Sequence, residues 1–314
     1  MIVHYCFLIS ISFITAIGLM LWWHLGNTPS KQRHLYLDQS HQTPVGMLDF
    51  VVAFMIWLGV PSLIVGVLAA TWQVTDFTLL DADQTNVIMF SMAVAQLLGC
   101  AAIVCLGIIR YGVIDWLFAS KMPYHRQIIL AAKTFCMVVP IVWGVQALLS
   151  LIVPYEHETL EQLSENFSVW TMLSTWLGAV GAAPLCEELI FRGVLQSWLH
   201  RICAPKHERD SISEFTGGWS LVTGQKDIDT KPAPIEVRRL FWWMPIMISS
   251  AVFALIHVGQ GAAPIPLFLF AIGLGFVFRY TGSLIPCIAL HFMLNAFTMF
   301  WLTLQLMFPL KDAL

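Results

Sequence analysis

Residues 47–72 read MLDFVVAFMIWLGVPSLIVGVLAATW, a nearly unbroken apolar run. A helix needs about 20 apolar residues to cross a hydrocarbon core about 30 Å thick, and this run is long enough. Runs of this kind recur along the chain and give eight expected spans: Ile2–Trp23, Met47–Trp72, Val87–Ile109, Ile128–Val153, Trp170–Leu199, Phe241–Val258, Pro264–Phe278 and Ser283–Phe308. With only 11% charged residues, against about 25% in soluble domains, the chain is predicted to be an all-α, polytopic transmembrane helix bundle.

The charges between the runs indicate an orientation. Lysine and arginine fill alternate loops, whereas the intervening loops carry only acidic residues: Asp76, Asp81, Asp83, Glu156, Glu158, Glu161 and Glu165. The positive-inside rule then puts the basic loops in the cytoplasm and both termini outside. We expect a multi-pass protein of the bacterial cytoplasmic membrane, with the lipid bilayer as partner. The small net charge of -3 gives no sign of a nucleic-acid partner.

The chain is predicted to divide into two parts of four spans each. The first part is 1–160, and the second is 161–314 with a polar cytoplasmic loop at 204–239. We expect the first run to remain as an anchor, because it lacks the basic start and small-residue cleavage site of a signal peptide. The seven cysteines show no CxxC pair, so they predict apolar packing and neither a disulfide framework nor a zinc ribbon.

Few polar side chains lie inside the later apolar runs. The stretch 183–193, APLCEELIFRG, contains Glu187, Glu188 and Arg192. Arg192 lies four residues after Glu188, so the two share a helix face and can form an ion pair. Glu187 points about 100° away from Glu188 and is predicted to face other helices.

Two later runs carry the other intramembrane polar groups. His257 belongs to the sixth run, and His291 and Asn295 share one face of the eighth. The estimated depths of Glu187, His257 and His291 agree within about 10 Å, so these residues can converge. Gly178, Gly181 and Pro184 (a set of helix-weakening residues) predict a break in the fifth run that widens into a polar intramembrane cavity.

Three short motifs occur in order along this part of the chain. EELIFR at 187–192 resembles the EExxxR motif of the CPBP family of intramembrane proteases, which includes the Rce1-like CAAX prenyl proteases and the bacterial Abi proteins. FALIH at 253–257 resembles the FxxxH motif of that family, and HFMLN at 291–295 resembles its HxxxN motif. The resemblance covers about 171–300 and leaves out the first four runs and the loop 204–239.

The resemblance implies a peptidase that works inside the membrane. Glu187 and His257 would activate a water molecule for attack on a peptide carbonyl, and His291 and Asn295 would donate hydrogen bonds to the oxyanion. The ion pair described above would support the site. The implied substrate is a membrane-associated protein or peptide, with prenylated and lipid-anchored tails included.

Metal dependence is a separate question. Glu187, His257 and His291 are the ligand types of a catalytic zinc site that keeps one position open for water. The compact HExxH signature is absent, because the two His-Glu pairs, at His157 and His207, lack the second histidine. We therefore expect no tightly bound metal, with zinc as the open alternative.

Two other classes of protein remain open on the same residues. A proton-coupled transporter also needs charged groups inside the membrane. A non-catalytic scaffold would keep its polar groups apart or saturated by one another. Convergence of Glu187, His257, His291 and Asn295 on one cavity favours the enzyme.

Overall fold

The computed structural model describes residues 2–27, 44–74, 76, 80–112, 117–118, 120, 122–152, 168–203 and 235–308. Within these ranges the regular secondary structure is entirely helical. The helices are α1 (Ile2–Asn27), α3 (Met47–Trp72), α4 (Ala82–Tyr111), α5 (Tyr124–Leu149), α7 (Val169–Thr175), η3 (Trp176–Ala182), α8 (Ala183–Glu188), η4 (Leu189–Gln196), α9 (Ser197–Cys203), α11 (Ile235–Leu255), α12 (Pro264–Thr281) and α13 (Leu284–Met307). The predicted loop 204–239 lies outside the described residues up to 234.

The predicted all-α membrane bundle is confirmed. Seven described helices are long and apolar enough to cross a membrane, with α7 to α9 counted as one continuous span, Val169–Cys203. The sixth expected span corresponds to α11, whose described apolar part, Trp243–Leu255, is shorter than the others. The division into 1–160 and 161–314 remains a prediction.

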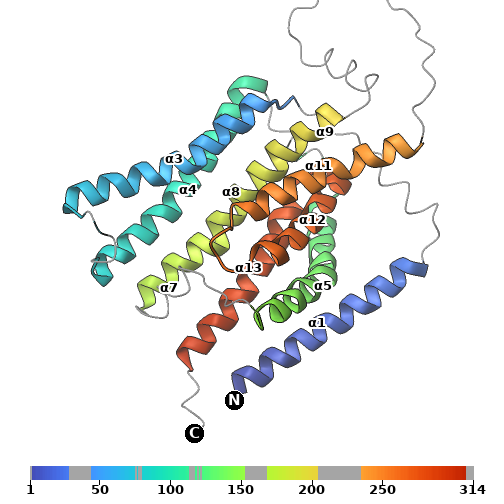
Figure 1. Cartoon of the computed structure of the whole chain (residues 1–314), viewed down its shortest axis with the longest axis horizontal. Helices are drawn as coiled ribbons and strands as arrows, with labels where there is room; N and C mark the ends of the chain where they lie inside the picture. The colour runs from blue at the N-terminus through green and yellow to red at the C-terminus, as the bar shows by residue number, and fades with distance from the viewer. Residues whose placement is uncertain are drawn as a thin grey trace, which may run out of the picture.

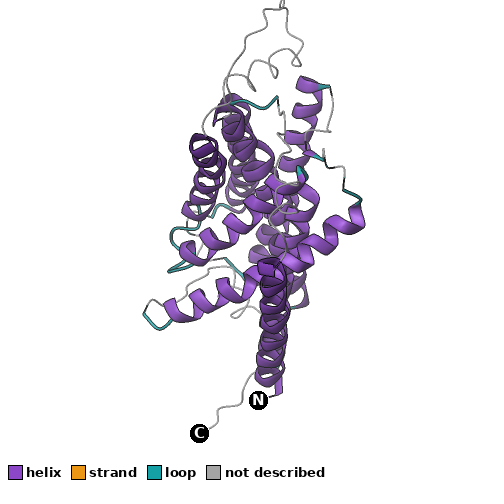
Figure 2. Ribbon diagram, turned by 90° about the vertical axis from the view of Figure 1, so that its right-hand side faces the viewer, coloured by secondary structure: helices purple, strands orange, loops and turns teal. Residues whose placement is uncertain are grey.

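The fifth span, α7 to α9, occupies the middle of the bundle (Figure 1). Helices α3 and α4 pack against each other and cover one side of it, while α5 packs against α12 and α13, and α1 lies at the edge against α5. The start of α1 and the end of α13 lie at the same end of the bundle in both views (Figures 1 and 2). This agrees with an even number of crossings; the side that faces the cytoplasm remains a prediction.

The predicted break in the fifth span is wrong. The chain stays helical from 169 to 203, but two stretches, η3 and η4, are wound as π-helix on either side of the short α8. In a π-helix each N–H bonds five residues back, so the helix widens without leaving its backbone groups exposed to lipid. Proline and glycine therefore changed the winding of this helix and did not end it.

The sixth span ends earlier than predicted. Helix α11 stops at Leu255, and His257 lies in the turn that follows, where its N–H bonds to the carbonyl of Ala254 at 3.0 Å. Gly259 and Gly261 have φ angles of 109° and 58°, which side-chain-bearing residues rarely adopt. These glycines let the chain reverse before α12. The apolar run extends past the end of α11, so the apolar pattern wrongly placed His257 inside that helix.

The buried core surrounds the fifth span. Its largest side chains, each 0% exposed, include Ile190, Phe191, Phe253 and Phe270. The ring of Phe191 meets Phe253 edge to face, with centroids 5.3 Å apart, and so joins η4 to α11. The same packing brings α11, α12 and α13 around the acidic pair.

The close contact at Gly18 provides a test of how α1 packs against α5. A Cβ atom at Gly18 would collide with the backbone carbonyl of Cys136 on α5, whereas nothing lies within 4 Å of a Cβ atom at Gly66 on α3. We expect Gly18→Leu to destabilise the protein by about 1–3 kcal/mol, the usual cost of overpacking. Thermal unfolding in detergent should show a lower midpoint for Gly18→Leu and little change for Gly66→Leu; equal midpoints would contradict this packing.

Candidate active site

Glu188 lies at the centre of a buried polar cluster. Its side chain is fully buried at the end of α8. One oxygen, Oε1, lies 2.8 Å from Nδ1 of His291 on α13, and the other, Oε2, lies 3.2 Å from Nε of Arg192 on η4. A single carboxylate therefore ties a cation of its own helix to an imidazole from another span.

Arg192 is also fully buried. Its Nη2 donates a hydrogen bond to the carbonyl of Ala271 on α12 at 3.1 Å, and its guanidinium lies over the ring of Phe253, 4.7 Å from the centroid. A cation over an aromatic face is attracted by the electron density of the ring, more strongly where water is excluded. The carboxylate, the carbonyl and the ring together explain how an arginine is held in an apolar core.

His291 lies between the two carboxylates of the acidic pair. Its Nε2 is 3.8 Å from Oε2 of Glu187, too far for a direct hydrogen bond but within the range of an ion pair. Phe270 and Phe253 meet its ring edge to face, with centroids 5.4 and 5.9 Å away. The imidazole is therefore fixed in orientation, with Nδ1 directed to Glu188 and Nε2 directed towards Glu187.

These contacts indicate where the proton of each histidine lies. An ionised carboxylate can only accept, so His291 donates from Nδ1 to Glu188, and Nε2 carries a proton only when the ring is doubly protonated. His257 likewise uses Nδ1, 2.9 Å from the carbonyl of Phe253, which also only accepts. The Nε2 atom of the neutral His257 ring is therefore left as a base.

His257 approaches the cluster through Phe253. The two rings have centroids 5.1 Å apart, and Phe253 in turn contacts His291. His257 is partly exposed, in contrast to the buried His291. The turn after α11 thus brings a second imidazole to the side of the cluster that is less enclosed.

Asn295 binds a backbone carbonyl of the fifth span. Its Nδ2 donates to the carbonyl of Ala179 on η3 at 2.7 Å. In the π-helical register this carbonyl lies five residues before Pro184, which has no N–H to donate. The proline thus leaves one carbonyl without its helical partner, and Asn295 supplies the donor from α13.

The structure brings together most of the residues that the sequence singled out. Glu187, Glu188, Arg192 and His291 form one cluster, the predicted pairing of Glu188 with Arg192 is observed, and Asn295 is joined to η3. The bond from Glu188 to His291 was not predicted, because helical spacing shows only contacts within one helix. Gln196 was also missed, although its place four residues after Arg192 in an apolar run was a usable signal.

The candidate metal ligands do not fit a zinc site. Among the described residues, no group of three histidine, cysteine, aspartate or glutamate side chains is arranged to hold a metal ion. An intramembrane metalloprotease is therefore not supported.

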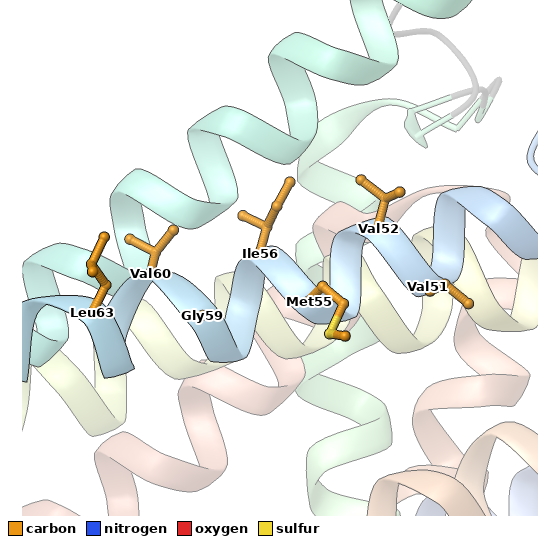
Figure 3. Close-up of a pocket in the computed structure, with 7 residues that line it drawn as sticks. All are labelled: Val51, Val52, Met55, Ile56, Gly59, Val60 and Leu63. Carbon is orange, nitrogen blue, oxygen red and sulfur yellow. The ribbon is translucent and has the colours of Figure 1, made fainter. Parts of the chain in front are cut away.

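An open groove of about 340 Å³ runs along α3 (Figure 3). It is lined by Val51, Val52, Met55, Ile56, Gly59, Val60 and Leu63. Met55 and Leu63 are 66% and 68% exposed, as expected for side chains that face lipid tails. With no titratable group in its lining, this groove is not the polar cavity predicted around Glu187.

Comparison with known proteins agrees with the three motifs. Residues 169–297 match the family model described as type II CAAX prenyl endopeptidase, Rce1-like. The match includes all three motifs, so the resemblance to the CPBP family is confirmed over this segment. No curated protein and no solved structure matches the chain. The description of that family model names peptidases of the CAAX type.

The buried ion pair gives a prediction for stability. In Arg192→Met, Glu188 would remain buried without a guanidinium beside it. We therefore expect the free energy of unfolding to fall by about 3–5 kcal/mol. The double variant Glu188→Gln, Arg192→Met removes both charges and should recover much of that loss. Thermal or denaturant unfolding of the two single variants and the double variant measures the coupling; additive losses would show that the pair does not stabilise the fold.

Proposed function

We propose that the protein is an intramembrane endopeptidase that hydrolyses a peptide bond in a membrane-associated protein or peptide. Prenylated and otherwise lipid-anchored tails are included in this substrate class. The observation that carries the proposal is the position of His291 between Glu187 and Glu188, inside the segment that matches a family of peptidases. A carboxylate and an imidazole side by side are the groups that general base catalysis needs.

In the proposed reaction, Glu187 removes a proton from a water molecule while the oxygen of that water attacks the peptide carbonyl. His257 assists through Nε2, the nitrogen that its bond to the carbonyl of Phe253 leaves as an acceptor. The tetrahedral intermediate then collapses, the C–N bond breaks, and the proton held by Glu187 passes to the departing amine. The products are one carboxylic acid and one amine, and the proton of the acid then passes to the amine to give a carboxylate and an ammonium group, so atoms and charge balance.

The oxyanion of the intermediate needs donors. Doubly protonated His291 keeps one N–H on Glu188 and offers the other, at Nε2, to the oxyanion. Asn295 donates one amide hydrogen to Ala179 and has a second hydrogen for the substrate.

A proton-coupled transporter is the alternative that the same contacts favour. Glu187, His291 and Glu188 form a chain along which a proton could move, as in membrane pumps. Charge movement across liposomes that contain the protein and no peptide substrate would support transport. A non-catalytic scaffold requires neither cleavage nor charge movement.

The location is part of the proposal. We infer a bacterial cytoplasmic membrane with the basic loops in the cytoplasm, because the charge pattern of the loops follows the positive-inside rule. The substrate would then meet the protease within the bilayer or at its surface. No metal is assigned a role in the reaction.

Glu187→Gln tests the general base. The change removes the acceptor charge with almost no change in volume, so we expect cleavage to fall at least about a hundredfold, the lower end of general-base contributions. The rate would be measured by comparing membrane proteomes, or a cleaved tail once one is found, with the native protein and the variant. Asp83→Asn, an exposed carboxylate in the first turn of α4, is the matched control and should cleave normally. Full activity of Glu187→Gln in a folded protein would refute this role.

A second prediction concerns the substrate. Because the cluster is buried in a membrane bundle, a tail that partitions into the bilayer reaches it at a higher local concentration. We expect a lipidated peptide to be cut at least about tenfold faster than the same peptide without its lipid, since each buried methylene adds about 0.8 kcal/mol to partitioning. The comparison uses reconstituted protein and a pair of peptides that differ only in an isoprenoid on cysteine. Equal rates would remove lipid-anchored tails from the proposed class.

A further inference from the structure

A line of buried polar side chains leads away from the cluster along one face of the fifth span. Glu188, Arg192, Gln196 and His200 follow one another at intervals of four residues, and we call them the polar stripe. The first three are 0% exposed, and His200 is partly exposed near the end of the span. The stripe therefore connects the buried cluster with the end of the helix that carries His200 and Arg201.

The winding of the helix keeps these residues together. Residues 189–196 are π-helical, and a π-helix has more residues per turn than the 3.6 of an α-helix. Residues four apart consequently drift less around the axis than in a long α-helix. The contact of Gln196 with His200, with Nε2 atoms 3.3 Å apart, continues the stripe into α9.

Several polar atoms along the stripe have no hydrogen-bond partner among the described residues. They are Oε2 of Glu188, Nε and Nη1 of Arg192, and Oε1 of Gln196. Oε2 of Glu188 and Nε of Arg192, 3.2 Å apart, form an ion pair, but they are not aligned as a hydrogen bond. Buried polar atoms without protein partners are the usual binding sites of internal water, since leaving them dry is costly.

The amide of Gln196 is fixed through its nitrogen. Its Nε2 donates to the carbonyl of Gly275 on α12 at 2.9 Å, which fixes the amide. A Cβ atom at position 275 would lie 3.1 Å from Oε1 of Gln196 and 2.7 Å from Ile246. Glycine at position 275 therefore allows α12 to approach closely enough for its carbonyl to accept from Gln196.

We propose that the polar stripe binds internal water molecules, which form an entry path for water from the helix end at His200 to the cluster of Glu187, Glu188 and His291. Water hydrogen-bonds to Oε1 of Gln196, Nη1 of Arg192 and Oε2 of Glu188 in turn. Each position offers a donor or an acceptor of the kind that a water molecule can satisfy.

The consequence for function rests on the proposed hydrolysis. A peptidase consumes one water molecule for each bond that it cuts, and the apolar bundle around this cluster is surrounded by lipid. The polar stripe supplies that water from the helix end and leaves the lipid-facing side of the bundle closed to it. The stripe is then a positioning and supply feature, and its residues beyond Glu188 do not touch the substrate.

The first test does not depend on activity. An experimental structure of the full chain that resolves ordered water should show water within about 3.2 Å of both Nη1 of Arg192 and Oε1 of Gln196. A dry contact at these atoms in the native protein overturns the proposal, whether or not the protein cleaves peptides. Water there in a protein that cleaves nothing supports the binding of water and counts against the proposed function alone.

The second test uses a matched pair of buried glutamines. Gln127 on α5 is 1% exposed, donates from Nε2 to the carbonyl of Met122 at 2.7 Å and has an unpaired Oε1, as Gln196 has, but it is not part of the stripe. Gln196→Met and Gln127→Met therefore remove the same groups at similar burial. We expect kcat to fall about tenfold for Gln196→Met with KM unchanged, which is the scale of one lost buried hydrogen bond. Gln127→Met should show no comparable fall.

A purely structural role of Gln196 would give a different result. In that case both variants would lower thermal stability and activity alike, and the ordered water beside Arg192 would remain in Gln196→Met. The entry path requires that this water be lost or displaced and that only kcat change. Equal kinetics of the two variants, or an unchanged kcat in Gln196→Met, overturns the supply role.

Discussion

The carboxylate of Glu188 is the group on which the rest of the site depends. Charged side chains are unfavourable inside a bilayer, by about 2.5–3.5 kcal/mol each on insertion scales. Glu188 neutralises Arg192 on its own helix and at the same time binds His291 on α13, while Arg192 reaches the carbonyl of Ala271 on α12. The buried pair of Glu188 and Arg192 thus joins three spans and orients an imidazole.

The π-helical winding of the fifth span explains two further features. On one side of α8, it puts the carbonyl of Ala179 opposite a proline that cannot donate, so Asn295 binds there and joins α13 to the fifth span. On the other side, it aligns the polar stripe along one face. Glycine and proline, which ordinarily interrupt a helix, here tune its register around the acidic pair, a use of π-winding that is common at functional sites.

The features that could be predicted from the sequence are those set by local physics. Apolar runs predicted the helices, and 47–72 matched α3 at both ends. Helix α4 began earlier than its apolar run because Asp81 and Gln84 cap it reciprocally, which hydrophobicity does not register. The spacing of Glu188 and Arg192 predicted their pairing, since both lie on one helix face. The end of α11 before His257 was missed because it lies inside an apolar run, and the glycines at which the chain reverses come only afterwards, at 259 and 261.

By itself the sequence determined the membrane environment, the helical class and the set of polar groups available for chemistry, because each follows from composition and from spacing within one helix. Only the tertiary structure decided that His291 bonds to Glu188, that Asn295 takes the carbonyl of Ala179 and that Gln196 continues a buried polar stripe. Those contacts join residues about 80 to 120 positions apart or depend on how one helix winds, and no local pattern encodes either the rotation of one helix against another or the register of a π-turn.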